Sequence, residues 1–174
     1  VIGGSLGARN INHAVIKKMD LIIKEGVQVI WQTGKVYYED MKSRLASYPQ
    51  DNVRLFEFIS AMDEAYACAD VVISRAGALS ISEICLAKKP VVLVPSPNVV
   101  EDHQTKNAMA IVNKEAALLI KEEDLDADFE NKFLQLVASR EKQRELGLNI
   151  KKLALVDATK QIADEVERLL KDSK

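Results

Sequence analysis

Apolar residues recur along the chain at two spacings, one typical of helices and the other typical of buried strands. A helical stripe at the i, i+3/i+4 spacing follows the first turn and ends at Gly26. Its apolar members are Ile11, Ala14, Val15, Met19 and Ile22. Further helices are expected over 37–46, 62–68, 79–87 and 104–113. Short apolar runs predict strands over 27–31, 53–59, 71–73, 90–94 and 117–120.

The alternation of strands and helices predicts the fold class. The run Val71-Val72-Ile73 is apolar on both faces, which is typical of a central parallel strand covered by helices on each side. Val1 and Ile2 predict the end of another strand, and because a strand usually runs about five residues, we expect the chain to be a fragment. Short connections between the elements predict an α/β fold with a doubly wound parallel sheet of about six strands.

The remainder of the chain, over 128–174, is expected to be helical. Asp157 is the expected N-cap of the last helix. The apolar face expected on that helix consists of Ala158, Ile162, Val166 and Leu169.

Length and composition narrow the classes of protein. A chain of 174 residues fits one domain over 1–174, and 48% apolar with 29% charged residues is typical of a globular protein. A net charge of −2 argues against nucleic-acid binding, and no apolar run approaches the roughly 18 residues that cross a bilayer. Cys68 and Cys85 lie in helical patterns without metal-ligand spacing, so we expect buried, reduced thiols in a cytosolic protein.

Two glycine-bearing turns, over 3–8 and 74–80, each lie between an apolar run and a helical pattern. The first N–H groups of a helix have no partner within it and lie at the positive end of its dipole, and glycine lets a phosphate approach closely. Ligands of doubly wound sheets bind at the carboxyl ends of the strands where the strand order reverses. Because the turns follow the expected first and fourth strands, they predict one crevice for a ligand with several phosphates, or with phosphate and sugar.

Ser80 and Glu83 are three positions apart at the start of the helix expected over 79–87. This spacing fits a capping box, in which each side chain accepts a backbone N–H of the first turn. It also fits a binding site, in which Ser80 holds a phosphate and Glu83 accepts hydrogen bonds from the vicinal hydroxyls of a ribose. The residues by themselves leave both interpretations open.

The polar run Glu101-Asp102-His103-Gln104 follows the strand expected over 90–94. One interpretation is a helix cap formed by Asp102, and the other is recognition of sugar hydroxyls by the amide and imidazole groups. His103 has no fixed partner to orient it, so it is not assigned as a general base. The chain has no Asp-x-Asp pair, no His/Cys ligand spacing and no Walker lysine, so we expect neither a metal nor a cofactor.

Five segments together closely resemble the bacterial MurG family of peptidoglycan N-acetylglucosaminyltransferases. They are GGSLGARNIN at 3–12, QTG at 32–34, FISAM at 58–62, SRAGALSISE at 74–83 and DHQTKNA at 102–108. The resemblance implies the Rossmann-like C-terminal, donor-binding lobe of a two-lobe GT-B fold. It also implies an enzyme that moves N-acetylglucosamine from UDP-N-acetylglucosamine to lipid I, undecaprenyl-pyrophosphoryl-N-acetylmuramoyl-pentapeptide, to make lipid II.

For the nucleotide, the resemblance implies roles for four residues. It places the main chain of Ile59 at the uracil edge and the carboxylate of Glu83 at the ribose hydroxyls. It places the hydroxyls of Ser5 and Ser80 at the diphosphate. Threonine also occurs at position 80 in the family, and serine preserves its hydroxyl.

For the sugar, the resemblance implies contacts between N-acetylglucosamine and Ala78, Leu79 and Gln104. The binding site that it implies is wider than these residues. Its further members are Gly4, Phe58, Gly77, Ile81, Ser82, His103 and Asn107.

The resemblance implies an inverting, metal-independent displacement at the anomeric carbon of the sugar. Helix N–H groups would stabilise the leaving UDP diphosphate in place of a metal. In the family the proposed base and the lipid-facing surface belong to an N-terminal acceptor lobe, which this chain lacks. We therefore expect donor binding without turnover from this chain, as one half of a protein that works peripherally at the cytoplasmic face of the bacterial plasma membrane.

Three other functions stay open at this stage. One is a stand-alone donor subunit that pairs with a separate membrane subunit. Another is a UDP-sugar epimerase on the same scaffold, whose acid and base would have to come from Glu101, Asp102 and His103. The last is a non-catalytic nucleotide-binding module.

Overall fold

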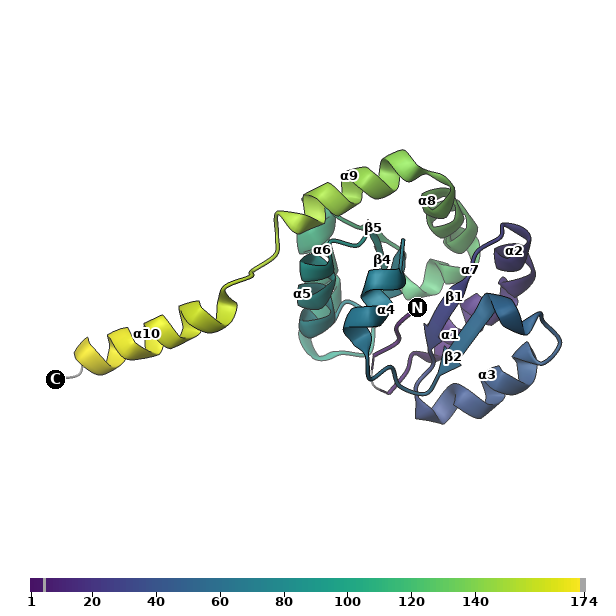
Figure 1. Cartoon of the computed structure of the whole chain (residues 1–174), viewed down its shortest axis with the longest axis horizontal. Coiled ribbons are helices and arrows are strands. Elements are labelled where there is room, and N and C mark those ends of the chain that lie inside the picture. The colour runs from purple at the N-terminus through teal and green to yellow at the C-terminus, as the bar shows by residue number, and fades with distance from the viewer. Residues whose placement is uncertain (5, 173–174) are drawn as a thin grey trace.

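The computed structural model describes residues 1–4 and 6–172, in which strands and helices alternate as the sequence predicts (Figure 1). The strands are β1 (Val29–Gln32), β2 (Val53–Phe56), β3 (Val72–Ser74), β4 (Val91–Leu93) and β5 (Leu118–Leu119). The helices are α1 (Arg9–Lys17), α2 (Met19–Lys24), α3 (Tyr38–Leu45), α4 (Met62–Cys68), α5 (Ala78–Ala87), α6 (His103–Val112), α7 (Leu125–Asp128), α8 (Gln135–Ala138), α9 (Arg140–Lys151) and α10 (Ala158–Asp172). The segment Phe129–Leu134 is a π-helix between α7 and α8.

The strands form a parallel sheet whose two halves meet at Ile2. β1 pairs with β2, and β4 pairs with both β3 and β5. Ile2 bridges Gln32 of β1 on one side and Ser74 of β3 on the other. Its N–H donates to the carbonyl oxygen of Ile73 at 2.8 Å, and its own carbonyl oxygen accepts from the N–H of Arg75 at 3.3 Å. The order across the sheet is therefore β2-β1-Ile2-β3-β4-β5, which is a doubly wound order.

The described residues form five strands where the sequence predicts about six. The difference lies at the expected first strand. Ile2 occupies the position of that strand but makes isolated bridges, because the chain turns away from the sheet at Gly3. The doubly wound parallel architecture itself is confirmed.

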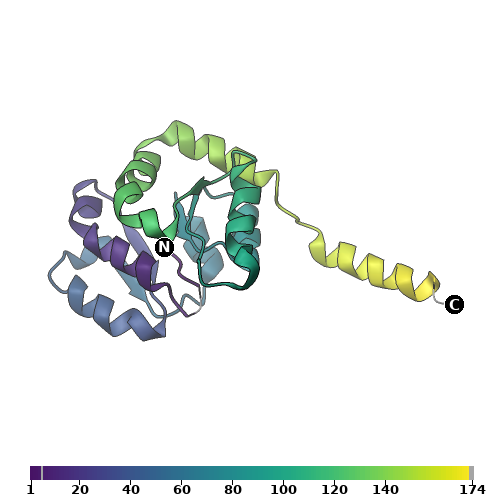
Figure 2. The same cartoon turned by 180° about the vertical axis from the view of Figure 1, so that it is seen from behind.

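Apolar residues of the strands alternate between the two faces of the sheet. Ile73 and Val92 pack in one cluster with residues of α1 and α7. Val72, Val91 and Leu93 pack in a second cluster with residues of α5 and α6. In Figure 1, α5 and α6 lie on one side of β4 and α7 lies on the other, and Figure 2 shows the molecule from behind. The prediction of a central strand over 71–73, buried on both faces, is confirmed.

Two stretches that the sequence predicts as continuous helix are interrupted in the structure. The first stripe is divided between α1 and α2, because the N–H of Lys18 donates to the carbonyls of both Ala14 and Val15 and tightens the turn there. The stretch 128–174 is interrupted at Ser139, whose backbone is extended and whose hydroxyl accepts from the N–H of Lys142 at the start of α9. A second interruption, over 152–157, precedes α10.

α10 begins directly after Asp157, as expected, and projects away from the other elements (Figures 1 and 2). The apolar face predicted for it is exposed, with Ile162 at 66% and Val166 at 52%. Neither apolar cluster includes a residue of α10. The described residues contain no helix with the length and hydropathy of a membrane span.

The two cysteines differ in their environment. Cys85 is buried in α5 as expected, but Cys68 at the end of α4 is exposed, so the expectation of a buried thiol is wrong there. Tyr66 takes the buried position of α4, and residues two apart on a helix face different directions. The side chain of Cys68 is therefore turned away from the core.

Candidate functional site

Both glycine turns leave the sheet at the carboxyl ends of neighbouring strand positions, the first after Ile2 and the second after β3. The first turn packs on the backbone of Thr33. Gly7 has a φ of +80°, and a Cβ there would lie 2.0 Å from the carbonyl oxygen of Thr33, so glycine is required. Ser5 belongs to this turn but lies outside the described residues, so its expected diphosphate contact stays a prediction.

The second turn leaves space in front of α5. Gly77 is the N-cap residue, with ordinary φ and ψ of −69° and 145°. A Cβ at Gly77 would meet no atom of the described chain closer than the Ser80 hydroxyl oxygen, at 3.9 Å. Neither backbone conformation nor packing therefore demands glycine here. No side chain caps α5, so the first N–H groups of the helix, on Ala78 and Leu79, point into this open space.

The structure rules out one of the two interpretations of Ser80 and Glu83, the capping box. A capping box needs Ser80 at the N-cap, but Ser80 lies inside α5, two residues beyond its first residue, and makes no cap. The capping interpretation is therefore wrong. The nearby Ser82 donates its hydroxyl to the carbonyl oxygen of Ala78 at 2.9 Å, and Ile81 packs partly buried against the second apolar cluster. The hydroxyl oxygen of Ser80 lies 3.9 Å from the position that a Cβ of Gly77 would take, so it is close to the amino end of α5 but does not cap the helix.

Glu83 has a partner that the sequence did not suggest. The hydroxyl of Tyr66, on α4, donates to Oε2 of Glu83 at 3.1 Å. Tyr66 is 7% exposed, whereas Glu83 is exposed. Burial, then the charge of Glu83 and the hydrogen bond to it, raise the pKa of Tyr66 above its usual range, so the phenol is a permanent donor at neutral pH.

Gln32 joins the first glycine turn to the segment after β2. Its Nε2 donates to the carbonyl oxygen of Gly4 at 3.0 Å, and its Oε1 accepts from the N–H of Ile59 at 2.8 Å. Ile59 therefore uses its N–H within the protein, and a uracil base would have to meet its carbonyl oxygen or displace Gln32. The neighbouring Phe58 is 61% exposed. The Gln32 side chain was not assigned a role from the sequence. The sequence feature that could have indicated one is that this polar residue directly follows an apolar strand.

A hollow of 430 Å³ opens beside the first glycine turn, between that turn and the loop after β4. Gly3, Gly7, Ser96 and Gln104 are among its lining residues. Oε1 of Gln104 accepts from the N–H of Ser96 at 3.0 Å, which fixes the amide at the rim. The hollow does not extend to Ile59, Ser80 or Glu83. Gln104 therefore lies at the same hollow as the first turn, and its expected contact with N-acetylglucosamine stays a prediction.

Asn107, one turn further along α6, donates to the carbonyl oxygen of Ala76 at 3.2 Å. This bond ties α6 to the second glycine turn. The two turns and the amino-terminal part of α6 are therefore connected through side chains as well as through the sheet.

Arg75 and Glu122, which both line the hollow, form an ion pair with side chains 13% and 8% exposed. Arg75 also donates to the carbonyl oxygens of Val94 and Pro95, both at 3.2 Å. The arginine thus holds together the carboxyl ends of β3, β4 and β5. Glu122 compensates the charge of the guanidinium in this largely buried pair.

The loop before α6 does not cap the helix as one interpretation of Asp102 requires. Asp102 is the N-cap residue, but its side chain makes no capping hydrogen bond, so that interpretation is wrong. Both Glu101 and Asp102 have positive φ, 55° and 53°, whereas a capping residue has extended backbone. His103 is exposed, and its Nδ1 donates to the carbonyl oxygen of Val100 at 2.8 Å, so the imidazole has a partner where none was expected. The described residues contain no cluster of three His, Cys, Asp or Glu suited to a metal ion.

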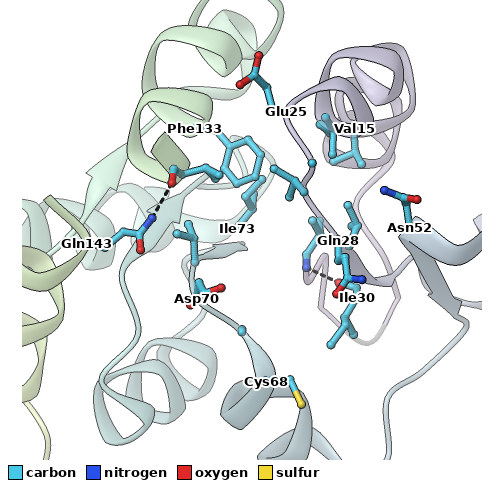
Figure 3. A pocket seen from close by; sticks show the side chains of 18 of the residues that line it. Val15, Glu25, Gln28, Ile30, Asn52, Cys68, Asp70, Ile73, Phe133 and Gln143 are labelled. Carbon is cyan, nitrogen blue, oxygen red and sulfur yellow. Dashed lines mark hydrogen bonds between the residues drawn. The ribbon is translucent and has the colours of Figure 1, made fainter. Parts of the chain in front are cut away.

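A second hollow, of 580 Å³, opens at the opposite, amino ends of the strands (Figure 3). Ile30, Ile73 and Phe133 surround it, and Asp70 lies where the chain enters β3. The backbone nitrogen of Val1 donates to the carbonyl oxygen of Ile30 at 2.7 Å on this side. Because ligands of doubly wound sheets bind at the carboxyl ends of the strands, this hollow is not the candidate site.

Comparison with known proteins finds a matching domain family and relatives that share one name. Residues 1–162 match the glycosyltransferase family 28 C-terminal domain. The whole chain is 51% identical to the UDP-N-acetylglucosamine--N-acetylmuramyl-(pentapeptide) pyrophosphoryl-undecaprenol N-acetylglucosamine transferase of Flavobacterium psychrophilum and covers 47% of that protein. Its identity to the protein of the same name from Christiangramia forsetii is 49%, over 98% of this chain and 45% of the relative.

A solved structure resembles the fold as well. The crystal structure of Acinetobacter baumannii MurG superposes with a TM-score of 0.82 at 28% sequence identity. The superposition covers 96% of this chain and 48% of that protein. The chain thus spans about half the length of the curated relatives it matches.

Proposed function

The chain belongs to the glycosyltransferase family 28 C-terminal domain family, and from this premise we propose that it is the donor-binding half of an N-acetylglucosaminyltransferase. Its donor is UDP-N-acetylglucosamine. The sugar passes to lipid I, which becomes lipid II in peptidoglycan synthesis. The names of the relatives that are 51% and 49% identical support this donor and this acceptor.

The open amino end of α5 is the observation that carries the proposal. Gly77 leaves space there that the protein does not fill, and uncapped N–H groups face it. A helix amino end of this kind binds phosphate through its N–H groups and its dipole. The diphosphate is therefore assigned to this position, with the hydroxyl of Ser80 beside it and Ser5 on the facing turn.

The remaining parts of the donor follow from the positions of their partners. The ribose lies at Glu83, one turn further along α5, and the uracil lies at Ile59 and Phe58. The N-acetylglucosamine extends to Leu79 and to Gln104 at the rim of the hollow of 430 Å³. The whole chain, over 1–174, acts as a single donor-binding domain.

The chemistry is a displacement at the anomeric carbon, with inversion and without a metal. As the glycosidic bond breaks, negative charge develops on the UDP diphosphate, and the fixed N–H dipoles of α5 stabilise it. The acceptor hydroxyl must lose a proton to a base. That base belongs to the other half of the longer protein, so this chain binds the donor without turning it over.

The other half covers the carboxyl edge of the sheet. Apolar side chains at this edge are strongly exposed, with Leu6 and Val100 at 80% and Leu79, in the first turn of α5, at 81%. An exposed apolar surface of this kind marks an interaction site. We assign it to an N-terminal acceptor half that holds lipid I at the cytoplasmic face of the plasma membrane, where the assembled protein is peripheral.

Calorimetric titration of the chain tests the proposal. We expect UDP-N-acetylglucosamine to bind at least about tenfold more tightly than GDP-mannose, a difference of about 1.4 kcal/mol. Ser80→Ala should weaken the binding about tenfold, because a hydrogen bond to a charged diphosphate is lost. Ser43→Ala, at an exposed site on α3, is the matched control and should bind as the wild type does.

Equal affinity for both sugar nucleotides, or an unchanged affinity in Ser80→Ala, would contradict the proposal. Product analysis after long incubation with UDP-N-acetylglucosamine separates donor binding from epimerisation. The donor should be recovered unchanged, and the appearance of an epimer would favour the epimerase instead.

A further inference from the structure

We propose that Tyr66 is a positioning residue for ribose recognition, acting through Glu83 and not through contact with the donor. The inference rests on the proposed function, which assigns Glu83 to the ribose hydroxyls. The hydroxyl of Tyr66 donates to Oε2 of Glu83 at 3.1 Å. The bond connects two helices, α4 and α5, that both begin at the carboxyl edge of the sheet.

Tyr66 is a rigid anchor. Tyr66 is 7% exposed and belongs to the second apolar cluster, together with Ile84 and Cys85 of α5. Glu83 is exposed and has three rotatable side-chain bonds, so without a partner its carboxylate would sample many positions. The hydrogen bond from a buried phenol selects one of them before the donor arrives.

The direction of the hydrogen bond from Tyr66 determines which acceptor atoms of Glu83 remain available to a ligand. An ionised carboxylate accepts hydrogen bonds and donates none, so the hydroxyl of Tyr66 must be the donor. With Oε2 engaged, Oε1 keeps its lone pairs for the vicinal hydroxyls of a ribose. Restricting a side chain to its bound position reduces the entropy lost on binding, which is the expected source of affinity.

The bond is therefore expected to matter for the ribose hydroxyls and for no other part of the donor. Tyr66→Phe keeps the ring and removes the hydroxyl, so packing in the second cluster is retained. We expect this variant to bind UDP-N-acetylglucosamine about fivefold more weakly than the wild type, the effect of one lost hydrogen bond. Its affinity for the 2′,3′-dideoxyuridine analogue of the donor should equal that of the wild type.

Two variants of Glu83 complete the experiment. In a Glu83→Ala background, Tyr66→Phe should change the affinity for UDP-N-acetylglucosamine no further, because the hydroxyl acts through the carboxylate. Glu83→Asp keeps the charge on an exposed residue but shortens the side chain away from Tyr66. It should bind the donor more weakly than the wild type and be insensitive to Tyr66→Phe. Tyr38→Phe, on α3, is the matched control, since its ring contact with Lys42 does not need the hydroxyl.

Each outcome separates this inference from the proposed function. If the wild type binds UDP-N-acetylglucosamine selectively but Tyr66→Phe binds it equally well, the role of Tyr66 is wrong and the proposed function stands. Equal weakening for the donor and its dideoxy analogue shows a merely structural role and also overturns the inference. If the wild type shows no preference for UDP-N-acetylglucosamine, the proposed function fails and this inference fails with it.

Discussion

The N–H of Ile59 donates to Oε1 of Gln32 at 2.8 Å, so a side chain from β1 holds the segment that follows β2. The same amide group donates through Nε2 to the carbonyl oxygen of Gly4. Gln32 is 2% exposed, and water cannot replace it easily. One buried amide thus fixes the first glycine turn relative to the segment assigned to the uracil.

Replacing Gln32 with methionine tests this connection. Gln32→Met keeps the size of the side chain but leaves the N–H of Ile59 and the carbonyl of Gly4 without their partner. We expect the free energy of unfolding to fall by about 1 to 3 kcal/mol, measured by urea denaturation. Gln28→Met, at an exposed position before β1, is the matched control and should stay within about 0.5 kcal/mol of the wild type. Equal stability of the two variants would show that the bridge contributes nothing.

Much of the fold follows from local pattern. The helix expected over 62–68 agrees with α4 at both ends, and the strand expected over 71–73 agrees with β3 within one residue. Both are short elements whose apolar residues follow a clear spacing. The break at Ser139 was not predicted, although a serine that caps the following helix is a local signal of this kind.

Part of the candidate site, too, could be predicted from the sequence, and part could not. The two glycine turns could be placed at the carboxyl edge of the sheet, because the sequence predicts both the strands and the turns that follow them. The bond between Tyr66 and Glu83 joins residues 17 apart, and the pair of Arg75 and Glu122 joins residues 47 apart. Contacts of this kind arise from packing between elements, which periodicity does not report. The resemblance named residues expected to meet the donor, but it did not name the residues that hold them in place.

The pair of Arg75 and Glu122 yields a second prediction. Glu122→Ala leaves a largely buried guanidinium without its counter-charge, so we expect a loss of about 3 kcal/mol in the free energy of unfolding. Glu123→Ala removes the neighbouring carboxylate, which is 76% exposed and lies 3.8 Å from Lys121. That control should change stability by less than about 0.5 kcal/mol. Comparable urea midpoints for the two variants would contradict the structural role given to the pair.

Thiol reactivity gives a third prediction. Cys68 is exposed, whereas Cys85 is 3% exposed and burial raises the pKa of its thiol. The reactive species is the thiolate, so Cys85 should be protected at pH 8 by both access and ionisation. Ellman's reagent should titrate one thiol rapidly in the native chain and two in denaturant. Cys68→Ser should leave no rapidly reacting thiol, and a fast signal from that variant would show that Cys85 is accessible.

The raised pKa of Tyr66 predicts the pH dependence of stability. A free tyrosine has a pKa of about 10, so above that pH the unfolded chain releases the phenol proton while the folded chain keeps it. The stabilisation is complete below about pH 10 and is lost as the pH rises further. Urea unfolding between pH 8 and pH 11 should therefore show a shallower loss in Tyr66→Phe than in the wild type. The raised pKa of Cys85 also lowers stability at high pH, but equally in the wild type and in Tyr66→Phe. Parallel plots of unfolding free energy against pH for the two proteins would therefore contradict the assignment to Tyr66.

The last prediction concerns the exposed face of α10. It compares two isoleucine residues on successive helices, one buried and one exposed. Ile150 in α9 is 1% exposed and belongs to the second cluster, whereas Ile162 in α10 is 66% exposed and belongs to neither cluster. We expect Ile150→Ala to reduce the free energy of unfolding by about 2 to 5 kcal/mol, because it opens a cavity in the core. Ile162→Ala should stay within about 0.5 kcal/mol of the wild type. A chain that ends at Ala154 should likewise keep its thermal midpoint and lose only helical ellipticity, and a midpoint lowered as far as that of Ile150→Ala would show that α10 contributes to the core of this chain.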